Sequence, residues 1–115
     1  PRDCVNTFVE YVHQVREDMG IRIKSFGHAG DGNLHIYILR DDMNDAEWKK
    51  NLEDAMERMY KKARELKGLV SGEHGIGFAK MSYMGENYAP EKIELMRGIK
   101  KAFDPKGILN PTKLF

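Results

Sequence analysis

The sequence is poor in the features that mark secreted, membrane-spanning and nucleic-acid-binding proteins. A single cysteine, Cys4, excludes an internal disulfide and a zinc site built from several thiolates, so we expect a reducing, cytoplasmic location. Because apolar runs are only a few residues long, we expect neither a membrane span nor a signal peptide. The 19 basic and 18 acidic residues give a formal net charge of +1 and are interleaved, so no basic surface for nucleic acid is expected.

The length of the chain bounds its architecture. Its 115 residues allow one domain with a modest core. No internal repeat, low-complexity segment or linker divides residues 1–115, so we expect a single domain. The chain starts at Pro1 without a methionine, and we interpret it as a piece of a longer protein.

The spacing of apolar residues predicts the secondary structure. Asn44 followed by Glu47 has the pattern of a capping box. Gly20 and Gly68 are placed to end the first two helices, and Pro90 is placed to open the third. The expected elements are helices 3–19, 44–67 and 90–103, strands 21–26 and 34–40, a short strand 69–70, and an irregular helical turn within 78–88.

This order of elements predicts an α+β fold, in which helices pack on one face of a small antiparallel sheet. It corresponds to most of a ferredoxin-like unit without the opening strand, followed by a C-terminal helix. We expect missing upstream chain to complete the sheet.

Residues 26–35, FGHAGDGNLH, form the stretch around which the other elements are arranged. Asp31 and Gly32 are a favoured two-residue hairpin turn, because both tolerate positive φ. A two-residue loop would pair His28 with His35 and place both imidazoles on one face, with Cβ atoms about 5 Å apart. A longer loop would alter this register. Two imidazoles at this distance can bind one metal ion, although a plain turn flanked by polar histidines has the same pattern.

Residues 71–77, SGEHGIG, add a carboxylate and a further imidazole on a Gly-rich backbone. His28, His35 and Glu73 would together make a set of two histidines and one carboxylate with open positions for a substrate. This second cluster favours metal binding over the plain turn.

Neither Gly-rich stretch fits a nucleotide-binding loop. Gly72 and Gly77 have the spacing of a Walker A loop, but Phe78 stands where that motif has its lysine. The glycines of residues 27–32 lead into an expected strand rather than a helix, which is the wrong context for a dinucleotide pyrophosphate. The chain by itself is therefore not expected to enclose a flavin.

Three separated segments carry a resemblance to a known family. They are residues 27–35 (GHAGDGNLH), 71–77 (SGEHGIG) and 104–111 (DPKGILNP). Together they resemble the C-terminal domain of FAD-linked oxidases, a group that holds D-lactate dehydrogenase, D-2-hydroxyglutarate dehydrogenase and a subunit of glycolate oxidase. The resemblance implies the oxidation of a D-2-hydroxy acid to the 2-oxo acid, with hydride passing to FAD.

The resemblance also implies roles for individual residues. His28, His35 and Glu73 would hold a divalent metal (zinc, iron or manganese) that chelates the carboxylate and hydroxyl groups of the substrate. His74 would be the general base that takes the hydroxyl proton, and its alternative role is a hydrogen bond within the loop. Asn110 would approach the flavin, and a cap at the end of a strand is the alternative there.

One position departs from part of the family. Members of the hydroxyglutarate type resemble one another in having Asn two residues after the second motif histidine, where this chain has Tyr37. This difference favours a smaller acid, such as lactate or glycolate, over a substrate with a second carboxylate.

The larger departure is the lack of the family's FAD-binding domain and of its upstream basic substrate-binding residues. We therefore expect the isolated chain to be inactive. Its expected partners are the FAD-binding domain of the same longer chain, a small 2-hydroxy acid and an electron-transfer protein. Two alternatives remain: a stand-alone metal-dependent ligand-binding module without redox chemistry, and an interaction domain whose motifs only shape turns.

Overall fold

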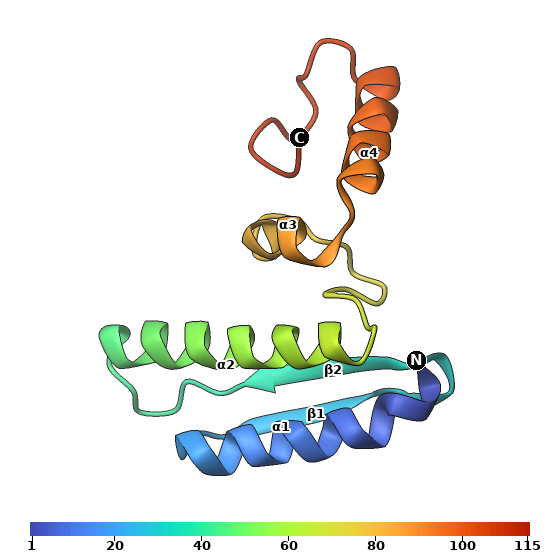
Figure 1. Cartoon of the computed structure of the whole chain (residues 1–115). Helices are drawn as coiled ribbons and strands as arrows, with labels where there is room; N and C mark the ends of the chain where they lie inside the picture. The colour runs from blue at the N-terminus through green and yellow to red at the C-terminus, as the bar shows by residue number, and fades with distance from the viewer. The chain divides into compact units, whose positions relative to one another are not determined.

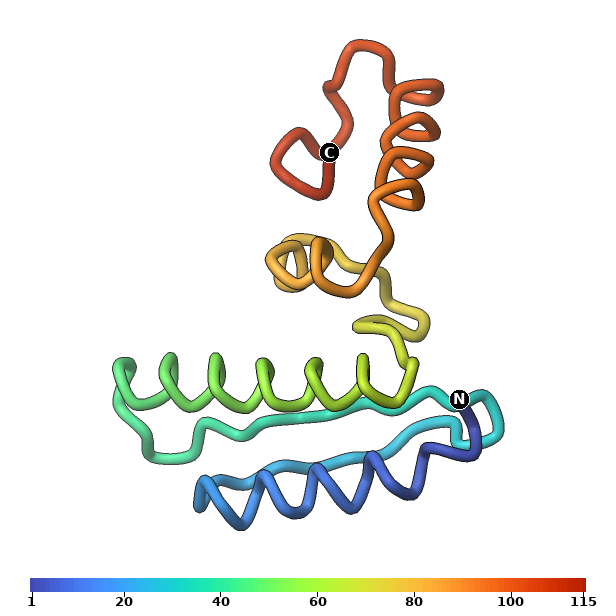
Figure 2. The backbone as a smooth tube through the Cα atoms, in the orientation of Figure 1, coloured from blue at the N-terminus to red at the C-terminus, as the bar shows by residue number.

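The computed structural model describes all 115 residues as two compact units, Pro1–Glu73 and His74–Phe115. The first contains η1 (Arg2–Cys4), α1 (Val5–Met19), β1 (Ile23–His28), η2 (Ala29–Asp31), β2 (Asn33–Ile38) and α2 (Asp45–Glu65). The second contains η3 (Met81–Tyr83), α3 (Met84–Asn87) and α4 (Pro90–Phe103), where η denotes a 3₁₀ helix. Figure 1 labels the helices and strands, and Figure 2 shows the backbone path within each unit.

The first unit is built on a core between α1, α2 and one face of the β1–β2 hairpin. Ile23 pairs with Ile38, and Ile36 lies on the same face because side chains alternate along a strand. Both helices pack on this face, which confirms the expected α+β class. Phe26 and Tyr37 lie on the opposite face, where each is more than half exposed. The buried members of the core are Val12, Val15, Ile21, Ile23, Ala55 and Met59.

The sheet has two strands, so the prediction of a third strand at residues 69–70 was wrong. Val70 is buried, and a buried side chain in an irregular segment gives the same short apolar signal as a strand. The neighbouring Leu69 is exposed. The apolar pair was therefore a sign of burial at one position rather than of strand pairing.

The two ends of α2 follow from local hydrogen bonding. The predicted capping box is confirmed: the Asn44 side chain accepts from the Glu47 backbone, and the Glu47 side chain accepts from the Asn44 backbone. The predicted end at Gly68 was wrong, because the helix ends at Glu65. Lys67 takes the left-handed conformation with φ 59°, and Gly68 N–H donates to the Ala63 carbonyl at 2.7 Å. This is a Schellman ending, in which the left-handed residue precedes the glycine.

Helix α1 begins two residues later than expected, since Arg2–Cys4 form the 3₁₀ turn η1. Its predicted end is confirmed, because Gly20 has φ 62° and its N–H donates to the last helical carbonyls. In the second unit, η3 and α3 form the expected irregular helical turn. Pro90 opens α4 as predicted.

Candidate metal centre

The hairpin places His28 and His35 on one face, although not as the direct pair that a two-residue turn predicts. The observed register joins His28 to Asn33 and Phe26 to His35. The loop is longer because Ala29–Asp31 form the turn η2 and Gly32 closes it with φ 71°. This moves the register by two residues, and an even shift keeps each side chain on its face. The ring centroids of His28 and His35 are 6.0 Å apart.

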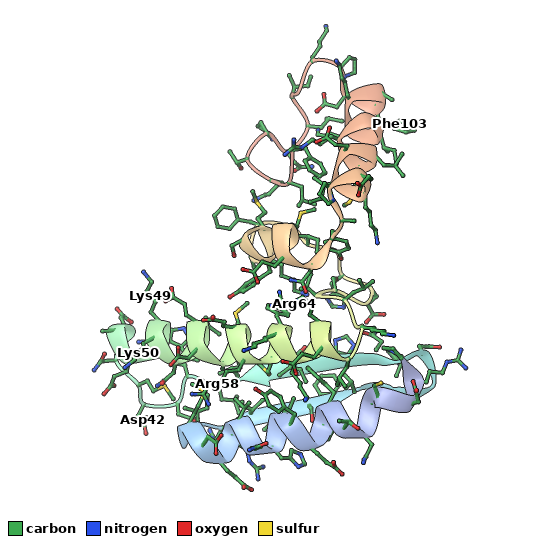
Figure 3. The ribbon with its side chains drawn as sticks, viewed as in Figure 1. Asp42, Lys49, Lys50, Arg58, Arg64 and Phe103 are labelled. Carbon is green, nitrogen blue, oxygen red and sulfur yellow. The ribbon has the colours of Figure 1, made fainter.

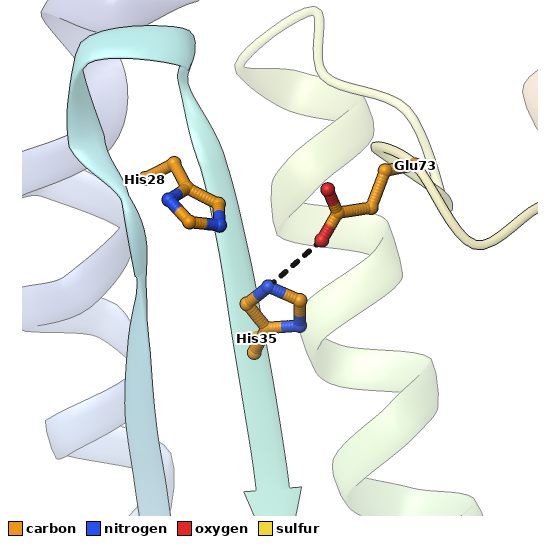
Figure 4. Close-up of side chains that lie close together, drawn as sticks. All are labelled: His28, His35 and Glu73. Atoms are coloured by element: carbon orange, nitrogen blue, oxygen red, sulfur yellow. Dashed lines mark ion pairs between the residues drawn. The ribbon is translucent and has the colours of Figure 1, made fainter.

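Glu73 brings the third potential ligand from the segment after α2. Its Oε1 lies 3.0 Å from Nε2 of His35, as Figure 4 shows. One ligand atom each from His28, His35 and Glu73 lies within 4.8 Å of the others. The His35 side chain is 19% exposed and that of Glu73 is 46% exposed, so the cluster is open to a ligand from solvent.

This set of donors fits a divalent transition metal. Two imidazole nitrogens and a carboxylate oxygen are ligands that zinc, iron and manganese accept, and three protein ligands leave coordination positions open. The three ligand atoms already lie within 4.8 Å of one another, so the backbone and the strand register need not change for them to approach one ion. His28, His35 and Glu73 could therefore close on one ion through small side-chain movements.

Two aromatic side chains that the motifs did not single out, Phe26 and Tyr37, extend from His35 along the hairpin face opposite the core. The Phe26 ring stacks on His35 at 5.3 Å between centroids. The same ring also stacks on Tyr37, at 5.1 Å between centroids. The signal was present in the sequence, since Phe26 opens the motif and Tyr37 follows His35 by two, the spacing of one strand face. The stack limits rotation of the His35 ring.

Two further candidate residues, His74 and Asn110, belong to the second unit. His74 is exposed, and the conformation of its loop includes left-handed glycines at 75 and 77. Asn110 also has a left-handed backbone, with φ 50°, and its carbonyl accepts from Lys113 N–H at 3.1 Å. Asn110 thus forms a turn before Pro111.

Asp104 organises the loop that leads to Asn110. Its carboxylate accepts from the backbone N–H of Ile108 at 3.0 Å and of Leu109 at 2.9 Å. The Lys100 ammonium donates to the same carboxylate. This hydrogen bond, followed by those from the two amides, holds the pKa of Asp104 below its usual value of 3.8.

Comparison with known proteins decides the family. The family described as FAD linked oxidases, C-terminal domain, matches residues 1–114. This chain belongs to that family. Within this FAD linked oxidase C-terminal domain, the match includes His28, His35 and Glu73 as well as the loop that carries Asn110.

The similarity of this chain to three named proteins supports its assignment to the family. The domain is 46% identical over 114 residues to D-lactate dehydrogenase of Anaerostipes hadrus, covering 99% of this chain and 24% of that protein. It is 40% identical over 115 residues to glycolate oxidase subunit GlcD of Bacillus subtilis, covering 100% and 24% respectively. It is 40% identical over 91 residues to D-2-hydroxyglutarate dehydrogenase of Stutzerimonas stutzeri, covering 78% and 20%. The chain thus spans about a quarter or less of the length of these relatives.

No helix in this domain is long and apolar enough to cross a membrane. The longest, α2, carries charged side chains along its length. Lys49, Lys50, Arg58 and Arg64 are labelled on it in Figure 3.

Proposed function

We propose that this chain is the metal- and substrate-side domain of a flavin-dependent D-2-hydroxy acid dehydrogenase or oxidase. The observation that carries the proposal is the convergence of His28, His35 and Glu73, with ligand atoms within 4.8 Å of one another. Because this cluster lies in a domain of the FAD linked oxidase family, a redox role is favoured over a purely structural one.

The three side chains would hold a divalent cation, which is zinc, iron or manganese on the chemistry of the donors. The bound groups would supply Lewis acidity at the metal and hydride acceptance at FAD. His28, His35 and Glu73 would fix the cation so that the carboxylate and hydroxyl of a 2-hydroxy acid enter the open coordination positions. The protein would therefore orient the substrate through the cation that these three ligands hold.

His74 is proposed as the general base. It follows Glu73 directly in the sequence, and a neutral imidazole accepts a hydroxyl proton near neutral pH. The hydroxyl proton would move to an imidazole nitrogen of His74. The hydrogen on the neighbouring carbon would leave with its electron pair, as the hydride for which FAD would be the acceptor, and a carbonyl group would form. The alternative role, a hydrogen bond that only shapes the loop, predicts an unchanged pH profile after substitution.

The remaining assignments concern the flavin, the choice of substrate and the electron acceptor. FAD would be bound mainly by a separate domain of the same longer chain, with Asn110 approaching the flavin from the turn before Pro111. Tyr37 favours lactate or glycolate over an acid with a second carboxylate. An electron-transfer protein would reoxidise the flavin, and the site of action would be the cytoplasm.

A chimera tests this proposal. In D-lactate dehydrogenase of Anaerostipes hadrus, the segment that matches this chain is replaced by residues 1–115. We expect the chimera to oxidise D-lactate or glycolate in preference to D-2-hydroxyglutarate, and the isolated chain with added FAD to be inactive. His74→Ala should lower kcat by about 10²- to 10⁴-fold and remove the loss of activity on the acidic side of the pH profile, where a general base is protonated and inactive. His13→Ala, on an exposed position of α1, is the matched control and should leave kcat unchanged.

The outcomes separate the hypotheses. Turnover by the isolated chain would contradict the need for a second domain. A folded chimera that binds FAD and metal without oxidising any of the three acids would favour the second candidate, a metal-dependent ligand-binding module without redox activity. The observation that supports this second candidate is the cluster of His28, His35 and Glu73 in the first unit, which could hold a metal ion.

A further inference from the structure

We propose that Asn33 is a positioning residue, which sets the place of Glu73 by contact with the backbone at Gly72. The inference rests on the proposed metal function of His28, His35 and Glu73. It adds to that function a residue that binds nothing itself and determines whether the three ligands converge.

The contact between Asn33 and Gly72 leaves no room for a side chain at position 72. A Cβ built on Gly72 would lie 2.2 Å from Oδ1 and 2.8 Å from Cγ of Asn33. The backbone of Gly72 has no positive φ, so conformation does not require glycine there. The requirement for glycine at 72 is therefore one of space, and the Asn33 side chain fills that space.

Asn33 lies next to two of the three potential ligands, His28 and Glu73. It is the strand partner of His28, and it precedes His35 by two residues, so all three side chains leave the same face of the hairpin. The Asn33 carbonyl oxygen also approaches the other strand, where a Cβ on Gly27 would lie 2.3 Å from it. Asn33 thus lies against Gly27, which precedes His28, and against Gly72, which precedes Glu73.

The segment that carries Glu73 has a second fixed point two residues upstream of Gly72. Val70 is buried, and it precedes Glu73 closely in the sequence. With Val70 held in the protein interior and Gly72 held against Asn33, the backbone at Glu73 has little freedom to move away from the hairpin. This arrangement accounts for the 3.0 Å approach of Glu73 Oε1 to His35 Nε2.

Four variants of the chain test the role of Asn33. Gly72→Ala places a methyl group against Asn33, Asn33→Ala removes the obstructing atoms, and the double variant does both. Gly30→Ala is the matched control, because a Cβ there meets nothing within 4 Å and its φ is not positive. Each variant is titrated with Zn²⁺ and with Mn²⁺ by calorimetry, after far-UV circular dichroism has shown that it is folded.

We expect Gly72→Ala to weaken metal affinity by about 10- to 100-fold, as loss of an outer-sphere partner does. Asn33→Ala should weaken it by about tenfold, the lower end of this range. The double variant should bind no more weakly than Asn33→Ala, because the clash is gone, and Gly30→Ala should bind like the wild type. Unchanged affinity in Gly72→Ala, or additive losses in the double variant, would overturn the proposal. If Gly72→Ala does not fold, wild-type affinity in Asn33→Ala overturns it.

A second measurement separates this inference from the metal function. The nitrogen NMR shifts of the His35 ring report its contact with Glu73 in the metal-free chain. If the wild type binds neither ion, the proposed metal function fails. The positioning role then stands if Gly72→Ala shifts the His35 ring signals and the double variant restores them, and it falls if those signals do not move.

Discussion

The two units of this chain bury their apolar residues to very different extents. Residues 1–73 bury a continuous core contributed by both helices and both strands. In residues 74–115, α4 exposes Leu95, Ile99 and Phe103, which are spaced four residues apart and form one stripe. Figure 3 labels Phe103 on this helix.

Different interactions accordingly stabilise the two units. The first has a buried core that defines its hairpin and hence the positions of His28 and His35. The second depends more on local polar contacts, such as the Asp104 carboxylate with its two backbone donors, and on cation–π contacts such as Lys113 over Phe78 at 5.3 Å. Substitutions of the same kind should therefore cost more in the first unit than in the second.

The largest contrast is expected between two glycines. Gly27→Ala forces a Cβ against the Asn33 carbonyl at 2.3 Å, at a φ of 157°, and should lower the free energy of unfolding by about 3 kcal/mol or more. Gly98→Ala in α4 meets nothing within 4 Å and should raise helix stability by about 0.5–1 kcal/mol. Urea unfolding of both variants measures the difference, and an unchanged midpoint for Gly27→Ala would contradict the described hairpin.

A matched pair of isoleucines tests the contrast in burial directly. Ile23 is 7% exposed and Ile99 is 53% exposed. Ile23→Ala should cost about 2–4 kcal/mol, because it removes buried methyl groups and leaves a cavity. Ile99→Ala should change stability by less than about 0.5 kcal/mol. Equal losses in thermal unfolding would show that the α4 stripe is covered in solution.

The helix starts offer a smaller contrast. Asn44 caps α2 through two backbone donors, whereas Ala89 at the start of α4 provides no side-chain cap. Asn44→Ala should destabilise the first unit by about 1 kcal/mol. Ala89→Asn should protect the first amides of α4 in hydrogen exchange. If Asn44→Ala changes neither the urea midpoint nor the amide hydrogen exchange of α2, the result contradicts the capping box.

The smallest effect is a pH dependence confined to the second unit. Because the folded pKa of Asp104 is lowered below 3.8, its ionised form stabilises the loop above that pH. This contribution is lost as the pH falls through the lower folded pKa. The amide NMR signals of Ile108 and Leu109 should therefore titrate with a midpoint below 3.8, and Asp104→Asn should abolish the titration. A midpoint at or above 3.8 would contradict the hydrogen-bonded carboxylate.

The sequence was informative where local rules decide the structure. The capping box at Asn44 and the left-handed Gly20 both follow from side-chain and backbone chemistry within a few residues, and both predictions were confirmed. The hairpin register was missed because η2 forms inside the loop, yet the shared face of His28 and His35 survived because the error was even. The face that His28 and His35 share depends on whether a register shift is even or odd, and less on the type of turn.

Contacts between distant segments were beyond such rules. The sequence suggested Glu73 as a ligand, but nothing in it indicated that Asn33 would lie against Gly72. The stacking of Phe26 on His35 and on Tyr37 was indicated only in part. The spacing of two puts His35 and Tyr37 on one strand face, but the place of Phe26 beside them follows only from the strand register. Val70 was misread for a related reason, since burial by tertiary packing imitates the pattern of a strand.

Metal titration of the chain measures whether His28, His35 and Glu73 together bind one ion. After treatment with a chelator, the wild type, His28→Ala, His35→Ala and Glu73→Ala are titrated with Zn²⁺ and Mn²⁺ by calorimetry, with His13→Ala as the control. We predict about one ion per wild-type or His13→Ala chain, and an affinity at least about 100-fold weaker in the other three variants. Absence of binding by the wild type, or equal binding by all five proteins, would contradict a metal centre at His28, His35 and Glu73.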